Sequence, residues 1–214
     1  MDLDLPSSIA NRFIRWCRAC NASEAEAEKV WPDLSALYQE SHRHYHTLAH
    51  IAASLAELDA TGKGTTELEG AIWFHDVIYE PTRADNEDAS ITWFVNVIGA
   101  WLAPATRNTI ARLIAATDFR KPRNDNPDEA LMVDIDLAIL SADWPVYDTY
   151  RRSVRREYAH VPDEAFRSGR AKVMASFLAA PVYRTPDFTP RETRAQGNIT
   201  REIAELGSAQ PLAS

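Results

Sequence analysis

His75 and Asp76 stand side by side in an apolar stretch that runs from Ile72 to Ile78. An ionised carboxylate is costly to bury unless a cation or several hydrogen-bond donors meet it. The fold must therefore bring a partner to this pair. Imidazole nitrogen and carboxylate oxygen are both ligands of divalent transition metals. A lone histidine here would more often be a satisfied core residue, but the adjacent aspartate favours a metal site.

Four of the six histidines lie upstream of this pair, within residues 42–50. We expect a helix to begin here and to run to about Asp59, so that His46 and His50, four residues apart, share one helix face. Thr47 stands where the H-E-x-x-H motif of zinc proteases has its glutamate base, which argues against a protease. Two surface histidines are the ordinary alternative, but that reading leaves no reason for a second histidine–aspartate cluster.

A fourth ligand is expected to be a carboxylate from the segment 131–140, which offers Asp134 and Asp136. These two positions point about 200° apart on a helix, so we expect only one of them to face the interior. Asp136 shares its face with the more apolar stripe, formed by Met132, Val133, Ile139 and Leu140. We therefore predict Asp136 as the ligand. The alternative is that it caps a helix or pairs locally.

The chain is predicted to form a single all-α domain of eight to ten helices over residues 1–214. Glycine is scarce, apolar residues recur at helical spacing, and no sustained strand-type alternation appears. Ser23 and Glu26 form a capping-box pattern, and Pro32 is expected to break or restart the helix that follows. Loops are expected at residues 61–65, 80–84 and 120–128.

The charge of the chain limits its partners. A net charge of −8 argues against general nucleic-acid binding, which depends on neutralising phosphates. Residues 141–214 carry +2 and residues 1–140 carry −10. This division suits a small anionic substrate, and it is equally typical of a solvated helical surface. No apolar stretch is long enough to cross a bilayer and the N-terminus resembles no signal peptide, so a cytoplasmic location is expected.

Cys17 and Cys20 form a lone C-x-x-C in a segment typical of a helix with an apolar stripe. A zinc ribbon would need a second such pair, and a thioredoxin motif would need a preceding strand. We therefore expect two reduced thiols on a helix, which suits a reducing compartment.

The order of these motifs resembles the HD-domain superfamily of metal-dependent phosphohydrolases. More narrowly, it is similar to an uncharacterised bacterial branch described as predicted metal-dependent HD phosphohydrolases. The resemblance covers about residues 30–205 and rests on four motifs in order, a more specific signal than the H…HD…D pattern alone. The matching segments are 42–51, 73–79, 85–90 and 134–140, with weaker similarity at 154–158, 182–183 and Asn198.

The resemblance implies an all-helical enzyme whose metal is held by His50, His75, Asp76 and Asp136. In the Y-H-N-x-x-H motif of cyclic-nucleotide phosphodiesterases, the second histidine binds metal and the first is the general acid. On that similarity His50 is the ligand and His46 the proton donor. Other HD proteins use a histidine that aligns with His46, which stays the alternative first ligand.

Further roles are assigned to residues around this set. Glu87 is predicted to orient a catalytic water together with Asp76, although an acid at a helix N-terminus also has a structural reason to exist. Arg43 is predicted to hold phosphate through its planar guanidinium. Arg155 and Arg170 are weaker candidates for holding phosphate and are expected to pair with Glu157 or Asp163 on the surface instead. His42 and His44 are expected to face solvent or to support the metal ligands from outside.

The leading hypothesis is metal-dependent hydrolysis of a phosphate ester of a nucleotide or a small phosphorylated metabolite by metal-activated water. The alternative is a non-catalytic helical ligand-binding or regulatory module that retains a metal site. Oxidative chemistry at two irons is a third hypothesis. It is disfavoured because this chain has Asp118-Phe119-Arg120 where relatives often carry a further histidine.

The identity and number of ions stay open. The nitrogen and oxygen ligands admit Mn, Fe, Co, Ni, Zn or Mg, and the missing histidine favours one ion over two. Assembly stays open as well, since six tryptophans leave room for an aromatic interface in a homo-oligomer.

Overall fold

The computed structural model describes residues 5–122 and 125–208. Within these residues the chain forms ten α-helices, three short 3₁₀ helices and no strand, which confirms the predicted all-α fold. Part of the loop expected at 120–128 lies outside the described residues. The α-helices are α1 (Leu5–Ala19), α2 (Glu24–Leu37), α3 (Leu48–Thr61), α4 (Thr66–Phe74), α5 (Asn86–Val97), α6 (Pro104–Ala115), α7 (Pro127–Asp136), α8 (Trp144–Glu157), α9 (Asp163–Phe177) and α10 (Glu192–Gly207), and the 3₁₀ helices are η1 (Gly99–Trp101), η2 (Leu137–Ser141) and η3 (Thr189–Arg191).

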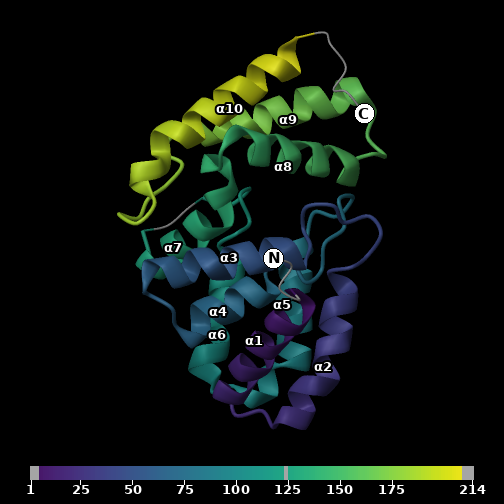
Figure 1. The fold of residues 1–214 in the computed structure, drawn as a ribbon, viewed down its shortest axis with the longest axis vertical. Helices are drawn as coiled ribbons and strands as arrows, with labels where there is room; N and C mark the ends of the chain where they lie inside the picture. Colours follow the sequence, from purple (N-terminus) through teal and green to yellow (C-terminus); the bar gives the residue numbers. More distant parts are fainter. Residues whose placement is uncertain (1–4, 123–124, 209–214) are drawn as a thin grey trace.

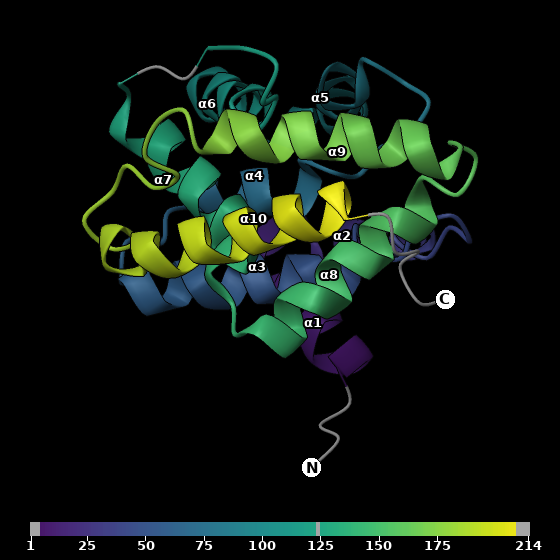
Figure 2. The same cartoon turned by 90° about the horizontal axis from the view of Figure 1, so that it is seen from above.

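The helices are arranged in two parts, visible one above the other in Figure 1. Helices α1–α7 form the larger, N-terminal part, and α8–α10 form a layer across one end of it. Helices α9 and α10 pack along each other in this layer, as Figure 2 shows from above. The 3₁₀ helix η2 leads from α7 into the layer and contacts both α8 and α10. The functional candidates gather where the two parts meet.

Helix α4 is the centre of the N-terminal part. It packs against α1, α3, α5, α6 and α7, and six of its nine residues are buried. Its Trp73 and Phe74 rings meet the ring of Phe13 edge-on, with centroids 5.3 and 6.3 Å apart. Such aromatic burial contributes much of the stability of a small helical core. It also fixes the C-terminal end of α4, where His75 and Asp76 follow.

Pro32 lies inside α2 instead of breaking it, so that expectation was wrong. The Ser23–Glu26 capping box is present and starts the helix as predicted. Pro32 removes the backbone donor that would reach the carbonyl of Glu28. Both residues are exposed, so water can satisfy that carbonyl and the helix continues.

Cys17 and Cys20 are free, buried thiols at the end of α1. Burial raises the pKa of Cys20 to about 12 and that of Cys17 further still. Thiols of this kind are poor nucleophiles, and they act as core residues. No helix among the described residues has the length and apolar character needed to span a membrane.

Gly70 allows α4 to approach α1 and α6 closely. A Cβ at this position would lie 2.7 Å from Trp16 Cζ2 and 2.8 Å from Ile110 Cδ1. Gly70→Ala is therefore expected to lower the free energy of unfolding by about 1–3 kcal/mol, measured by urea denaturation, because a packed core resists an added methyl group. Gly197→Ala on α10, where nothing lies within 4 Å, is the control and should raise stability by up to about 1 kcal/mol. Equal effects of the two substitutions would contradict this packing.

Candidate metal centre

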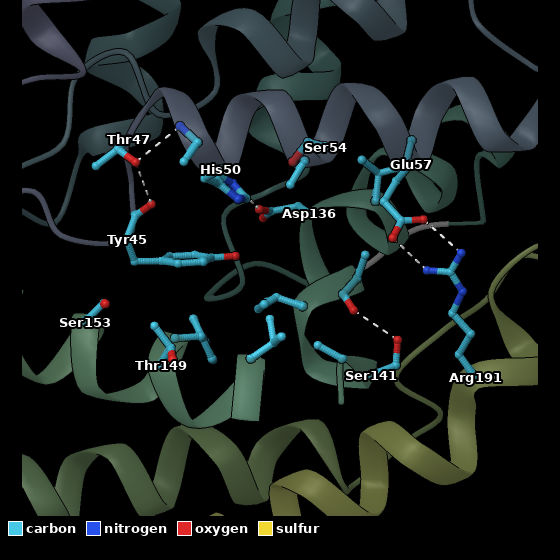
Figure 3. Close-up of a pocket in the computed structure, with 18 of the residues that line it drawn as sticks. Tyr45, Thr47, His50, Ser54, Glu57, Asp136, Ser141, Thr149, Ser153 and Arg191 are labelled. Carbon is cyan, nitrogen blue, oxygen red and sulfur yellow. Dashed lines mark hydrogen bonds and ion pairs between the residues drawn. The ribbon is translucent and has the colours of Figure 1, made fainter. Parts of the chain in front are cut away.

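Two histidines and two aspartates converge where three helices begin or end. His50 lies in the first turn of α3, His75 caps the C-terminus of α4 with Asp76 next to it, and Asp136 is the last residue of α7. His75 Nε2 lies 3.2 Å from His50 Nε2 and 3.0 Å from Asp76 Oδ2. Asp136 Oδ1 lies 3.2 Å from His50 Nε2 and 3.5 Å from His75 Nε2. Figure 3 shows His50 and Asp136 pointing toward each other.

These spacings fit a bound divalent ion. Ligand atoms that bind a cation at about 2.0–2.2 Å lie roughly 3–3.5 Å from their neighbours in the coordination shell. The ring of His75 is also oriented for this role. Its Nδ1 lies 3.0 Å from the carbonyl oxygen of Ile72, which assigns the proton to Nδ1 and turns Nε2 to the cluster. His50, His75 and Asp76 alone form a group that could hold a metal ion.

The electrostatics of the cluster also favour a cation. Burial by itself lowers the pKa of His75, but Asp76 and Asp136 outweigh burial and hold this pKa well above its ordinary value. Burial by itself raises the pKa of Asp76, but His75 and His46 outweigh it and hold the carboxyl far below its usual range. The two carboxylates thus favour positive charge at His75, in the middle of the cluster.

Asp134 and Asp136 have different partners, and both are directed inward. The expectation that only one would face the interior was therefore wrong. Asp134 is fully buried and accepts hydrogen bonds from the backbone N–H groups of Arg184 and Thr185 and from the Thr185 hydroxyl, at 2.7–3.1 Å. It anchors the segment that follows α9, whereas Asp136 faces the histidines.

Asp134→Asn and Asp136→Asn separate these two roles. Asp136→Asn is expected to weaken divalent-ion binding by more than the roughly 10–100-fold that an outer partner contributes. Asp134→Asn should cost about 1.5–3 kcal/mol of unfolding free energy, because it removes a charge-assisted acceptor, and should keep the ion. Metal content and urea denaturation measure both effects. The reverse pattern would place the ligand at Asp134.

Glu157, at the end of α8, holds the histidine segment in place. Its Oε1 accepts hydrogen bonds from the backbone N–H groups of His44, Tyr45 and His46, at 2.8, 2.7 and 3.0 Å. Its Oε2 lies 2.8 Å from His46 Nδ1 and accepts from the Tyr79 hydroxyl at 3.1 Å. One carboxylate thereby ties the C-terminal layer to the segment that carries His46.

His46 lies before α3, since Thr47 is the N-cap of that helix. The prediction that His46 and His50 share one helix face was therefore wrong. His50 makes the contacts with His75, Asp76 and Asp136, whereas the His46 ring stacks on Tyr79 with centroids 4.0 Å apart. Burial lowers the pKa of His46, but Asp76 and Glu157 outweigh burial and raise it. His46 is thus held in place beside the cluster, and the nearby carboxylates favour its protonated form.

Glu157 was expected on the surface as a partner of an arginine, and this was wrong. Its side chain is fully buried, while Arg155 pairs with Asp163 as predicted. Arg170 pairs with Glu202 instead. The signal that could have revealed Glu157 is its place three residues after the buried Val154, on the apolar face of α8.

The Glu157 carboxylate should contribute pH-dependent stability. Burial raises its pKa, but the bonds to His46 and the backbone outweigh burial and lower the pKa from 4.5 to about 2. A depressed carboxyl pKa stabilises the fold above the unfolded pKa, and this stability disappears as pH falls toward the folded value. Glu157→Gln should therefore cost about 2–3 kcal/mol at pH 7, with the gap narrowing between about pH 4.5 and pH 2.

Urea denaturation across this pH range measures the gap between Glu157→Gln and the unsubstituted protein. Glu164→Gln on the exposed start of α9 serves as the control, with a gap near zero at neutral pH. A gap for Glu157→Gln that stays constant from pH 7 to pH 3 would contradict the contribution assigned to this carboxylate.

Arg43 does not face the cluster as a phosphate anchor, so that prediction is corrected. Its side chain is fully buried. It donates to Glu40 at 3.0 Å and to the backbone carbonyls of His46, Asp76 and Val77 at 2.7–3.1 Å. With its donors engaged, the guanidinium joins the histidine segment to the residues that follow α4.

Of the other two upstream histidines, His44 is exposed, as expected. His42 is half-buried, and its Nε2 lies 2.8 Å from the carbonyl oxygen of Tyr79. Glu87 lies in the first turn of α5 and pairs with Arg120 at 3.0 Å, and burial raises the pKa of its carboxyl. Its side chain also lines a cavity together with Asp76.

Two cavities meet at Asp136. The larger, of about 1010 Å³, lies between α3, η2 and α8, with Glu57 and Arg191 paired at its far end (Figure 3). The smaller, of about 780 Å³, contains His46 and is here called the second cavity. Its lining holds four cationic residues and four acidic ones; they are Arg83, Arg120, Lys172 and Arg184, and Asp76, Glu87, Asp118 and Asp136.

Comparisons of the chain with protein-family models, with curated proteins and with solved structures found no match. The function of the site must therefore be inferred from its geometry and chemistry.

Proposed function

We propose that this protein is a metal-dependent phosphohydrolase of the HD type, acting on a phosphate ester of a nucleotide or a small phosphorylated metabolite. The observation that carries the proposal is the convergence of two imidazoles and two carboxylates, whose nitrogen and oxygen atoms lie 3.0–3.7 Å apart. His46 lies beside them and is held in place by Glu157. The motif order that resembles HD phosphohydrolases supports the same interpretation.

The ion would be held by His50, His75, Asp76 and Asp136. A divalent cation bound there would polarise a phosphoryl oxygen and lower the pKa of a coordinated water. Its identity stays open among Mn, Fe, Co, Ni, Zn and Mg, because nitrogen and oxygen donors suit all of them.

His46 is proposed to protonate the leaving oxygen. When water attacks phosphorus and the ester P–O bond breaks, the departing alkoxide needs a proton, which His46 would donate from its place beside the cluster. Glu157 accepts from Nδ1 and therefore leaves Nε2 directed away from itself. Glu157 acts through His46 and is a positioning residue. General acid catalysis of this kind contributes about 10²–10⁴-fold to rate.

The second cavity is proposed to receive the phosphate group. Its four cations would attract the phosphate oxygens, and the ion held by Asp76 and Asp136 would offset the charge of these two carboxylates in the same lining. Arg120 donates to Asp118, to the Ala84 carbonyl and to Glu87, so its donors are engaged like those of Arg43. The phosphate contacts are therefore assigned to Lys172 and Arg184. These side chains take over the role that the sequence had suggested for Arg43.

Substitutions of His46 and His50 test whether His46 donates the proton and His50 binds the metal. His46→Asn is expected to lower kcat by about 10²–10⁴-fold and to leave the metal content unchanged. His50→Asn should remove the bound metal and the activity together. His44→Asn is the matched control, since His44 is exposed on the same segment and should retain both.

The measurements are elemental analysis and phosphate release from a panel of phosphomonoesters and phosphodiesters with each divalent ion. Metal binding without turnover of any ester would contradict the proposal and favour a non-catalytic metal-binding module. Loss of metal in His46→Asn with retention in His50→Asn would make His46 the first ligand.

A further inference from the structure

The larger cavity, between α3, η2 and α8, reaches the metal centre at His50 and Asp136 (Figure 3). Its volume of about 1010 Å³ is at the upper end of the range for cavities that bind organic ligands. Val146 lines it from α8 with 54% of its surface exposed, which is unusual for a large apolar side chain. Much of the remaining wall consists of apolar side chains, most of them short; they include Ala49, Ala53, Ile135, Ala138, Ile139 and Ala142.

The charged residues of this cavity all have partners of opposite charge. Glu57 and Arg191 make two contacts, at 2.9 and 2.8 Å, and Arg194 pairs with Asp143 at 2.9 Å. Asp136 faces the histidines of the metal centre. A charged group on a ligand would therefore meet no unpaired counterion along this lining, and burial of a charge without a partner is costly. The cavity favours an uncharged group.

Three hydroxyl groups of the lining have no hydrogen-bond acceptor among the described residues. Ser54 is only 3% exposed, so its hydroxyl is enclosed by the cavity. The Tyr45 ring packs against Tyr150 and His50, with centroids 4.6 and 4.9 Å apart, and Figure 3 shows its hydroxyl end directed into the cavity. The Tyr150 hydroxyl accepts from Arg170 at 3.0 Å and keeps its own proton to donate. Because enclosed donors are normally satisfied, these hydroxyls indicate an oxygen acceptor on the ligand.

We propose that the larger cavity receives the alcohol part of the substrate, and that this part is an uncharged aliphatic group with an oxygen acceptor close to the phosphate. This assignment rests on the proposed function, because it takes the phosphate to bind at the metal centre. The apolar wall would hold the carbon chain, and the tyrosine and serine hydroxyls would donate to the oxygen.

The position of the cavity suits a leaving group. Asp136 lines both cavities, so a phosphate in the second cavity places its ester oxygen at the entrance to the larger one. The rings of His46 and Tyr45 have their centroids 5.0 Å apart, which puts the proton donor beside this entrance. On hydrolysis the water oxygen bonds to phosphorus, the ester P–O bond breaks, and the alcohol departs with the proton from His46.

Alkyl esters of increasing length test the apolar wall. For the Mn²⁺-loaded full chain, kcat/KM for hexyl phosphate should exceed that for ethyl phosphate by roughly 2- to 4-fold for each added CH₂ group. Calorimetry should show the same preference in the dissociation constants of hexylphosphonate and ethylphosphonate, whose P–C bond is not hydrolysed. Adenosine 5′-monophosphate is measured alongside as an ester with a different organic part.

Two substitutions from different helices should remove the preference for the longer chain. Ala53→Phe fills the cavity from α3, and Val146→Asp places a charge against the chain from α8. An acid in the first turn of α8 is compatible with the helix. In both variants the ratio of hexyl to ethyl should fall close to one. Ala56→Phe is the matched control, because Ala56 is exposed on α3 outside this lining, and it should keep the ratio of the unsubstituted protein.

The hydroxyl groups are tested with 2-propoxyethyl phosphate, in which an ether oxygen replaces one CH₂ of the hexyl chain. Tyr45→Phe should lower kcat/KM for this ester relative to hexyl phosphate by about 2- to 10-fold, because one hydrogen bond is lost. Tyr158→Phe is the control for this substitution, since Tyr158 lines the second cavity, and it should leave the ratio as it is.

Four results would overturn this assignment. They are equal values for hexyl and ethyl in the unsubstituted protein, a preference that survives both Ala53→Phe and Val146→Asp, equal effects of Tyr45→Phe on the ether and hexyl esters, and adenosine 5′-monophosphate favoured over hexyl phosphate. Turnover of ethyl phosphate without a preference for length leaves the phosphohydrolase standing and refutes the aliphatic site. Neither binding nor turnover of any ester refutes both.

Discussion

The buried Glu157 carboxylate is the interaction on which the arrangement of the site depends. A carboxylate without water is stable only when donors surround it, and here three backbone N–H groups, one imidazole and one phenol do so. These donors belong to the N-terminal part of the chain, whereas Glu157 belongs to α8. The same bonds therefore join the two parts of the fold and set the orientation of His46, so the stability of the fold and the geometry of the candidate site depend on one residue.

The cluster itself is placed where helix ends favour a cation. His75 and Asp136 stand at the C-termini of α4 and α7, and these ends carry partial negative charge. Two carboxylates add to that field, and the aromatic core around α4 keeps the supporting backbone rigid. His50, His75 and Asp76 are thereby grouped so that they could hold a metal ion.

Much of this could be predicted from local sequence, and the rest depends on distant partners. Helical periodicity gave the all-α fold, and the apolar stripe beside Asp136 indicated which carboxylate faces the histidines. The helix was expected to include His46 because Thr47 was not recognised as its N-cap. Glu157 was missed because the segments it binds lie 111–113 residues away along the chain, while nearby arginines suggested surface pairs. The prediction that Arg43 holds phosphate was wrong because its side chain is buried, and the local sequence does not indicate that burial.

The acidic residues 1–140 and the more basic residues 141–214 both contribute side chains to the second cavity. The candidate metal ligands all come from the acidic N-terminal part, whereas Lys172 and Arg184 approach the same cavity from the C-terminal segment. A phosphorylated ligand between them would contact both parts of the molecule at once. Its anionic oxygens would be attracted by cations of both parts, since Arg83 and Arg120 line the cavity from the N-terminal part. The hydrogen bonds of Glu157 join the same two parts next to His46, so the residue that links the two parts also supports one wall of this cavity.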